Sequence, residues 1–414
     1  MKILFDLSAT QPFQGNNIHG GGEYAKTVFF KLCEIIPPEI SLEIFYNPTR
    51  NIDNKLIELC KNKFVQINTC INKSEISRLL CTKKYDVYYS ALPYSYYDLT
   101  IPKETKFVYT IHGLRSLEYV EDKYEIKYHN FLLKKTIKHI AFSIFPFLFS
   151  WWKSRKIKNK ILNLNKLFYL TENQTIITLC NHTKYSISLF FPNINISSIK
   201  LYYPPLKNYF SYEDFNLNNT KILDSLSLKE NKYILLICGD RSEKGAYRAC
   251  RILFDLMENY NNFPKDIKII VLGASNNRHY QKLTKNNDRF IFHDYVTTEV
   301  LEILYKHAHL LLFPTLNEGF GIPPLEAMKY GVLSACSANS SMPEVYGESV
   351  LYFNPYDKTE MCIRILQSFD NTIREEKSIK MALQYKKIRE KQESDLNSLI
   401  NEIIRNGTTF YASC

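Results

Sequence analysis

The sequence predicts an α/β protein with two Rossmann-like domains. Short β-rich runs alternate with helical patterns along most of the chain, which is typical of parallel sheets covered by helices. The length of 414 residues exceeds what one hydrophobic core usually organises. The pair Pro204 and Pro205, followed by a polar stretch to about residue 219, divides the alternation into two halves.

The first half begins with a βαβ unit, formed by a strand at 3–7, a helix at about 23–36 and a strand at 42–46. Further strand candidates lie at 64–68, 86–90, 107–111, 175–179 and 199–203. Helical patterns separate several of these strands, so we expect a mainly parallel, doubly wound sheet.

The second half repeats this alternation. Its strand candidates lie at 234–238, 267–272, 290–292, 310–313, 332–336 and 350–353. A charged helical pattern runs from residue 375 to about 405, and we expect it to pack back across the first domain. The predicted divisions are 1–205 for the first domain, with a helical excursion at about 119–165, then 206–385 for the second domain and 386–414 for the returning helix.

The composition indicates an ordinary globular protein, with 45% hydrophobic and 23% charged residues. The net charge of +11 suits an anionic partner such as a phosphate or a membrane surface, whereas the dispersed basic residues and the lack of a recognised module argue against nucleic acid. The ten cysteines form no metal-ligand pattern, so we expect reduced thiols and no bound metal. The first residues read as a strand and not as a signal peptide, which predicts a cytoplasmic protein, free or peripheral on the inner face of the cell membrane.

The pattern of residues 311–331 predicts a strand, then a glycine-containing loop, and then a helix that begins near Pro323. A helix N-terminus concentrates unpaired N–H groups and positive dipole. A phosphate could therefore bind beside Gly319, Phe320 and Gly321, where no large side chain separates the two glycines from a ligand.

Two carboxylates frame this loop, Glu318 before it and Glu326 inside the helix. One could bind sugar hydroxyls and the other a ribose diol, because carboxylates accept hydrogen bonds. The alternative is a surface loop followed by an acidic helix start, which the dipole also favours.

The pattern resembles the E-G-F-G-x-x-x-x-E hallmark of retaining glycosyltransferase family 4 (glycosyl transferases group 1). That resemblance implies the GT-B fold, with two Rossmann-like domains facing each other across a cleft and a C-terminal helix crossing back to the first domain.

A second segment, 233–253, reads as an apolar strand that breaks at Gly239 into a basic loop and then a helix. Arg241 and Lys244 follow the carboxyl end of this strand, where open α/β sheets bind ligands, and their charge suits a diphosphate. A solvated loop is the alternative. The family resemblance implies an Arg and a Lys here, but at a wider spacing, which leaves open whether Arg241 or Arg248 partners Lys244.

In the first domain, His112 ends a strand where the resemblance implies a donor-site histidine, although a lone histidine there is more often structural. Gly21 and Gly22 lie in a run of three glycines that permits close approach of a ligand, or is simply a flexible turn. The family places this loop near the diphosphate and acceptor. We also assign Val296 to the donor-binding set.

The segment 131–160 is aromatic and aliphatic between 140 and 152 and basic on both sides. It is too short to span a bilayer but suits insertion at a membrane surface through about 140–158, with Trp151 and Trp152 at the level of the headgroups. The alternative is an ordinary helical excursion that Pro146 breaks in two.

The resemblance implies a retaining, metal-independent hexosyltransferase without a cofactor. It would move a sugar from a nucleoside diphosphate sugar to a glycan or lipid-linked acceptor in cell-surface polysaccharide assembly. The implied catalytic residues are Glu318, His112, Lys244 and Arg241. Two alternatives remain: a non-catalytic GT-B partner subunit that binds sugar nucleotide or glycan, and a GT-B sugar-nucleotide epimerase.

Overall fold

The computed structural model describes residues 1–12, 20–119, 124–128, 146–205, 219–237, 239–275 and 277–405. The chain divides into two compact units. Unit 1 comprises Met1–Leu114, Ile157–Ser211 and Arg389–Cys414, and unit 2 comprises Arg115–Lys156 and Tyr212–Ile388. The sequence assigned the whole excursion at 119–165 to the first domain, whereas the structure groups its residues up to Lys156 with unit 2.

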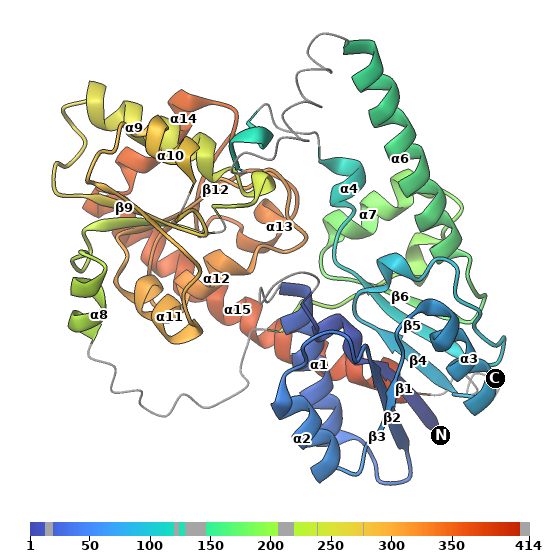
Figure 1. Ribbon diagram of the computed structural model, residues 1–414. Helices are drawn as coiled ribbons and strands as arrows, with labels where there is room; N and C mark the ends of the chain where they lie inside the picture. Colours follow the sequence, from blue (N-terminus) through green and yellow to red (C-terminus); the bar gives the residue numbers. More distant parts are fainter. Residues whose placement is uncertain are drawn as a thin grey trace. The chain divides into compact units, whose positions relative to one another are not determined.

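Unit 1 contains a seven-stranded parallel sheet in the order β3-β2-β1-β4-β5-β6-β7. Its strands are β1 (Lys2–Asp6), β2 (Ser41–Tyr46), β3 (Gln66–Thr69), β4 (Val87–Ser90), β5 (Lys106–Ile111), β6 (Gln174–Thr178) and β7 (Lys200–Leu201). Its helices include α1 (Gly20–Ile35), α2 (Asn54–Asn62), α3 (Lys73–Lys83) and α7 (Asn181–Phe190), drawn in Figure 1. The strand order reverses between β1 and β4, the kind of position where doubly wound sheets bind ligands.

Apolar strands covered on both faces explain why this sheet forms. Ile3, Leu4 and Phe5 of β1 are completely buried, and the Phe5 ring lies 5.1 Å from Phe29 of α1 and 5.0 Å from Tyr89 of β4. Such near-continuous apolar runs are typical of parallel strands with helices on both sides.

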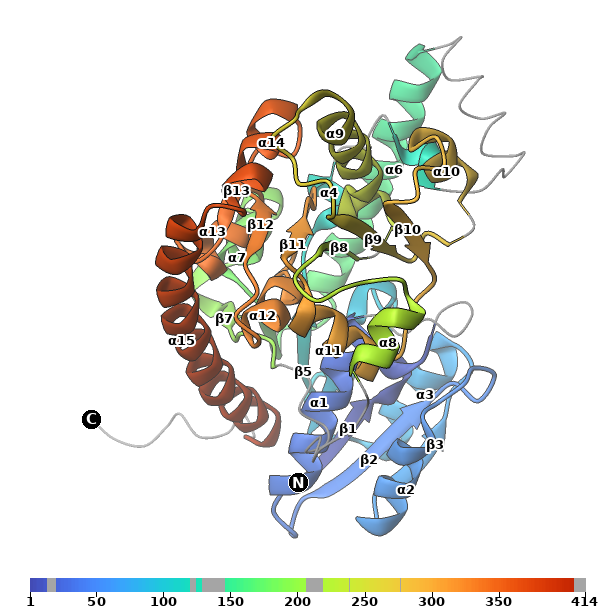
Figure 2. The same cartoon turned by 90° about the vertical axis from the view of Figure 1, so that its left-hand side faces the viewer.

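Unit 2 contains a six-stranded parallel sheet in the order β10-β9-β8-β11-β12-β13. Its strands are β8 (Tyr233–Leu236), β9 (Lys268–Leu272), β10 (Phe290–His293), β11 (Leu310–Phe313), β12 (Ser334–Ser337) and β13 (Leu351–Phe353). Its helices include α8 (Asn219–Ser225), α9 (Ala246–Asn259), α10 (Arg278–Leu283), α11 (Thr298–His307), α12 (Ile322–Met328), α13 (Met342–Tyr346) and α14 (Lys358–Gln367). Figure 2 shows α9, α10 and α14 on one face of this sheet and α8, α11 and α12 on the other. The switch in strand order falls between β8 and β11, which pair directly.

The long helix α15 (Asn371–Ile404) contributes to both units. In unit 2, Gln384 Nε2 donates to the carbonyl of Val345 at 2.5 Å. In unit 1, Asp395 accepts the backbone N–H of Tyr203 at 2.7 Å, and Gln392 Nε2 donates to the carbonyl of Pro204 at 2.5 Å. Buried polar bonds of this kind fix the helix in register, because each would be costly to leave unmade.

The prediction of two parallel-sheet α/β domains is confirmed, with strand ends displaced by at most a few residues. One local expectation differs: Gly20 to Gly22 form the first turn of α1 and not a loop before it. Among the described residues, none of the helices is long and apolar enough to cross a membrane. The predicted linker at 206–218, and residues 131–145 of the aromatic and basic segment, lie outside the described residues. Its described part starts with α6 (Pro146–Phe168), on which Trp151 is exposed.

Candidate functional site

The carboxyl ends of β8 and β11 bring the two sequence motifs of unit 2 together. The loop after β8 ends in a short 3-10 helix (Ser242–Lys244), and Gly245 follows it with a φ of +69°. A Cβ at Gly245 would lie 2.1 Å from the carbonyl oxygen of Pro314, directly after β11, so only glycine permits this approach. The backbone N–H of Leu316 then donates to the Glu243 carbonyl at 2.7 Å and joins the two loops.

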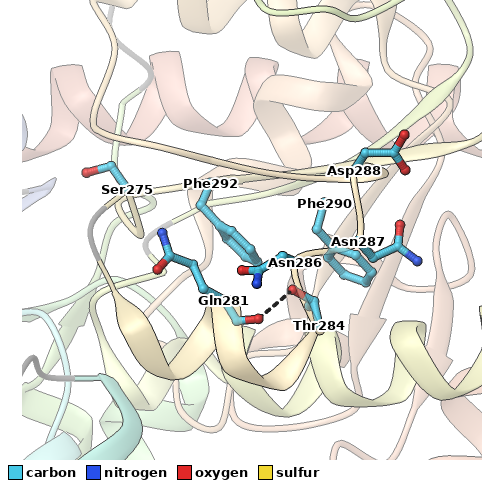
Figure 3. Close-up of a pocket in the computed structure, with 8 residues that line it drawn as sticks. All are labelled: Ser275, Gln281, Thr284, Asn286, Asn287, Asp288, Phe290 and Phe292. Atoms are coloured by element: carbon cyan, nitrogen blue, oxygen red, sulfur yellow. Dashed lines mark hydrogen bonds between the residues drawn. The ribbon is translucent and has the colours of Figure 1, made fainter.

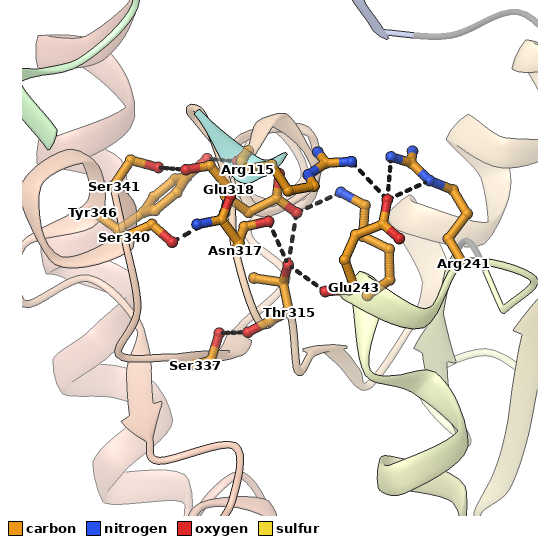
Figure 4. A network of polar contacts seen from close by, with 12 residues as sticks. Arg115, Arg241, Glu243, Thr315, Asn317, Glu318, Ser337, Ser340, Ser341 and Tyr346 are labelled. Carbon is orange, nitrogen blue, oxygen red and sulfur yellow. Dashed lines mark hydrogen bonds and ion pairs between the residues drawn. The ribbon is translucent and has the colours of Figure 1, made fainter. Parts of the chain in front are cut away.

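Lys244 and Glu318 form a buried ion pair at this junction (Figure 4). Their side chains are only 8% and 7% exposed, so water screens the pair weakly. Thr315 Oγ1 also donates to the same Glu318 oxygen at 2.9 Å, and the Glu318 backbone N–H donates to Ser340 Oγ at 3.0 Å. The carboxylate and the ammonium group are therefore held in one place by their surroundings, as a preorganised polar site requires.

A second ion cluster adjoins the first, because Glu243 precedes Lys244 in the chain. Glu243 Oε1 accepts from Arg241 Nε at 2.9 Å, from Arg241 Nη2 at 2.6 Å and from Arg115 Nη1 at 2.6 Å. Burial raises the pKa of Glu243, but Arg241 and Arg115 outweigh that effect and hold the pKa below its usual value. Glu243 is thus a fixed negative charge between two cations.

The two candidate arginines lie in different surroundings. Arg241 shares the network through Glu243, whereas the Arg248 guanidinium on α9 lies 5.0 Å from the ring centre of Tyr124 and 4.8 Å from that of Tyr356. Arg248 thus has an aromatic environment, typical of a cation held by ring faces. Of the two candidates, the structure brings Arg241 to the site.

The loop before α12 is shaped by Gly321, which has a φ of +82° and is followed by the helix. A Cβ there would lie 2.6 Å from Met342 Sδ, and the Gly321 carbonyl accepts a hydrogen bond from the Tyr346 hydroxyl. Phe320 is buried, and Glu326 lies half-buried within α12. Gly321 is therefore required by the turn itself.

Two further predicted residues of unit 2 lie outside this network. A Cβ at Gly239 would lie 2.8 Å from Val271 Cγ1, and the Gly239 carbonyl accepts from Tyr280 at 2.6 Å, so Gly239 allows close packing against β9. Val296 is half-buried in the connection between β10 and α11. The structure does not join either residue to the polar contacts of Figure 4.

One predicted residue of unit 1, His112, directly follows β5 at its carboxyl end. His112 Nε2 lies 2.9 Å from the carbonyl oxygen of Ala91, which can only accept, so Nε2 carries the proton. The His112 backbone N–H donates to the Tyr94 hydroxyl at 2.8 Å, and its ring meets that of Tyr24 edge-on at 4.9 Å. Because the ring is held from several sides, His112 has a single orientation within unit 1.

Gly21 and Gly22 lie on α1 of unit 1, where Gly22 is buried. A Cβ at Gly21 would lie 2.8 Å from Leu92 Cδ2, so this glycine permits close packing between α1 and the connection that follows β4. Packing against Leu92 gives a structural reason for one of the three glycines.

Sequence reasoning missed several residues that the structure adds to the unit 2 site. Thr315 and Asn317 both precede Glu318 in the chain. Thr315 Oγ1 donates to Glu318, and Asn317 Nδ2 donates to Glu118 at 2.6 Å. Arg115 and Glu118 belong to a short helix, α4 (Arg115–Glu118), that follows β5 in the chain. Their only sequence signal is a position just after His112, at the carboxyl end of a strand.

A separate hollow of about 280 Å³ lies beside α10 and β10 (Figure 3). Its lining residues are Ser275, Gln281, Thr284, Asn286, Asn287, Asp288, Phe290 and Phe292. None of the predicted site residues lines it. Among the described residues, no group of three or more His, Cys, Asp or Glu could hold a metal ion.

Comparisons with known proteins find a similarity to glycosyltransferases in part of the chain. A family model described as glycosyl transferases group 1 matches residues 232–371. The serotype-specific mannosyltransferase WbdA of Escherichia coli is 43% identical over 72 residues, which are 17% of this chain and 9% of that protein. The O-antigen chain mannosyltransferase B of Escherichia coli is 43% identical over 77 residues, which are 19% of this chain and 20% of that protein. The matched stretch thus spans a fifth or less of each relative.

Solved structures resemble the chain over nearly its whole length. HepE of Anabaena, in complex with UDP and glucose, aligns with a TM-score of 0.65 at 12% identity and covers 97% of this chain and 98% of its own. A glycosyltransferase from Rickettsia africae aligns with a TM-score of 0.60 at 13% identity and covers 98% and 99%. The chain therefore has the GT-B fold, and its residues 232–371 match the family model of glycosyl transferases group 1.

Proposed function

We propose that the chain is a glycosyltransferase that moves a hexosyl residue from a nucleoside diphosphate sugar to a glycan or lipid-linked acceptor. The buried Lys244 and Glu318 pair at the adjoining ends of β8 and β11 carries this proposal. It lies within the segment that matches glycosyl transferases group 1, at the switch point where open α/β sheets bind ligands.

Each predicted residue has a role that suits its chemistry. Glu318 would accept hydrogen bonds from the hydroxyls of the transferred sugar, and Glu326 those of the ribose. Arg241 and Lys244 would stabilise the charge on the leaving diphosphate, so no metal is required for that task. His112 would contact the donor sugar. With no nucleophilic carboxylate assigned to the opposite face of the sugar, we propose retention of configuration by front-face displacement.

For the donor sugar we propose mannose, and for the acceptor a growing surface polysaccharide. The relatives that match a stretch of 71–77 residues of this chain are named as mannosyltransferases, two of them of O-antigen chains. HepE, by contrast, was solved with UDP-glucose, so the nucleotide needs its own measurement. We further propose that the segment at about 140–158, with the exposed Trp151, brings the protein to a membrane surface on which a lipid-linked acceptor would lie.

The test is a panel of UDP, GDP, ADP and dTDP sugars, read first by thermal shift and then by transfer to acceptor. A bound donor raises the unfolding temperature by mass action. Glu318→Gln should abolish transfer while the fold persists, because a neutral amide accepts more weakly from sugar hydroxyls than a carboxylate does and no longer balances the charge of Lys244. Glu302→Gln is the matched control, since Glu302 forms an exposed pair with Lys329 in the same unit.

The outcomes separate the alternatives. Full transfer activity in Glu318→Gln would disprove the assigned site. Donor binding without turnover on any acceptor would favour a partner subunit, and conversion of the donor without acceptor would favour an epimerase. Loss of transfer after treatment with EDTA, restored by a divalent cation, would contradict metal independence.

A further inference from the structure

Arg115 brings a third cation to the site from the segment that follows β5 in the chain. We call the segments Arg115–Glu118 and Glu125–Tyr128 the strap. Although the strap follows β5 of unit 1 in the chain, it groups with unit 2. It therefore belongs to the same compact unit as Arg241, Glu243 and Lys244.

The second half of the strap is anchored on α9 and α10. Tyr128 is 3% exposed and accepts the backbone N–H of Tyr247 at 3.1 Å, and its ring lies 6.2 Å from that of Tyr280. Asn277 Nδ2 donates to the Lys127 carbonyl at 2.9 Å. Buried aromatic contacts and hydrogen bonds of this kind hold a segment in one place.

The first half of the strap reaches the polar network itself. Arg115 Nη1 and two nitrogens of Arg241 all donate to the single oxygen Glu243 Oε1. Two positive charges therefore meet one negative charge. Arg115 Nε is shielded from solvent and has no hydrogen-bond partner within the described part of the chain, which is unusual for a buried donor.

We propose that Arg115 binds the diphosphate of the donor together with Arg241 and Lys244; this inference rests on the proposed function. A guanidinium carries five donors in a planar fork that matches phosphate oxygens. The side chains of Arg115 and Arg241 are 39% and 38% exposed, so both reach solvent while Glu243 holds them next to each other. The solvent-exposed parts of both guanidinium groups would donate to a phosphate bound there, and its charge would offset the second of the two positive charges that share Glu243.

Glu243 acts in this scheme as a positioning residue. Its backbone carbonyl accepts from Thr315 and Leu316, so its carboxylate has a fixed place beside Lys244. Since both arginines use the same oxygen, their guanidinium groups converge. The pair presents a denser positive charge than either would alone, and density of this kind distinguishes a diphosphate from a neutral sugar.

The experiment compares nucleoside diphosphates with the corresponding nucleosides. Isothermal titration of the full chain with UDP, GDP and ADP first identifies the nucleotide that binds. We then expect Arg115→Ala to weaken binding of that diphosphate about ten- to a hundred-fold, the usual loss for a charge-assisted hydrogen bond. Binding of the nucleoside should change less than about twofold, because it has no phosphate.

Two further variants keep the test decisive. Arg115→Lys preserves the charge without the fork and should retain part of the diphosphate affinity, and it serves where the alanine variant does not fold. Arg78→Ala removes an exposed arginine from α3 of unit 1 and should leave both affinities unchanged.

The results have distinct meanings. Unchanged diphosphate binding in Arg115→Ala, or an equal loss for diphosphate and nucleoside, overturns the inference and leaves the proposed function standing. Failure of the unaltered chain to bind any nucleoside diphosphate overturns the proposed function and this inference with it.

Discussion

Replacing Lys244 with methionine leaves the Glu318 carboxylate buried without its cation. Removing one partner of a buried ion pair costs about 3–5 kcal/mol, because the remaining charge stays desolvated. Thr315 Oγ1 still donates to Glu318 in this variant, and such a bond to a charged group contributes about 1.5–3 kcal/mol. We therefore expect a loss near the lower limit, about 3 kcal/mol, or roughly 6–12 °C in Tm for a unit of this size.

The double variant Lys244→Met with Glu318→Leu tests the cause of that loss. Apolar replacement of both partners is often close to neutral. Thr315 Oγ1 keeps acceptors in the carbonyl groups of Glu243 and Asn317, at 3.2 and 3.3 Å, so no new buried donor is stranded. The double variant should therefore be more stable than the single variant.

Urea unfolding followed by circular dichroism measures these free energies for the three proteins in parallel. In the donor-binding panel both variants should lose donor affinity, even where stability returns. A loss below about 1 kcal/mol in Lys244→Met, or a double variant that is less stable than the single one, would show that the pair is neither buried nor coupled as described.

Three further results are expected. Gly245→Ala should lower stability and donor binding more than Gly331→Ala. Both glycines have a positive φ, but only at Gly245 would the new Cβ clash with the carbonyl oxygen of Pro314. Equal losses of stability in urea unfolding would contradict this. Burial lowers the pKa of His309 to about 4, and the nearby Arg374 adds to this effect. The neutral ring therefore stabilises the fold above pH 6.5 by about 3 kcal/mol, and this contribution is lost as the pH falls towards 4. His309→Gln should flatten that dependence in unfolding measured from pH 7.5 to 4. Trp151→Ser should weaken co-sedimentation with anionic vesicles, and unchanged binding would remove this residue from the proposed membrane surface.

Local patterns sufficed for the sheets and for part of the site. Runs such as Leu310–Phe313 are apolar throughout, and a short, wholly apolar run is the sequence pattern typical of a buried parallel strand. Glu318, Arg241 and Lys244 were predicted because strand ends and glycine loops are themselves visible in a sequence. The structure adds the contact between Lys244 and Glu318, which joins two of these predictions.

The rest of the site depends on contacts between distant residues. Arg115 and Glu243 are 128 positions apart, and no periodicity links them. The excursion containing Tyr128 has a helical and aromatic composition that fits either domain, so only its packing on Tyr247 assigns it to unit 2. The three glycines from Gly20 to Gly22 were expected in the connection before the first helix, but they form its first turn, where glycine is tolerated.

The strap has a consequence for how the protein is made. Tyr128 leaves the ribosome before its partners on α9 and α10, and at about 5–20 residues per second the roughly 120 residues to Tyr247 take about 6–24 s. During that time the aromatic side chain has no native surface to cover it. Unit 2 can complete its core only after most of the chain has been synthesised, so the strap stays uncovered until the later residues of unit 2 follow it.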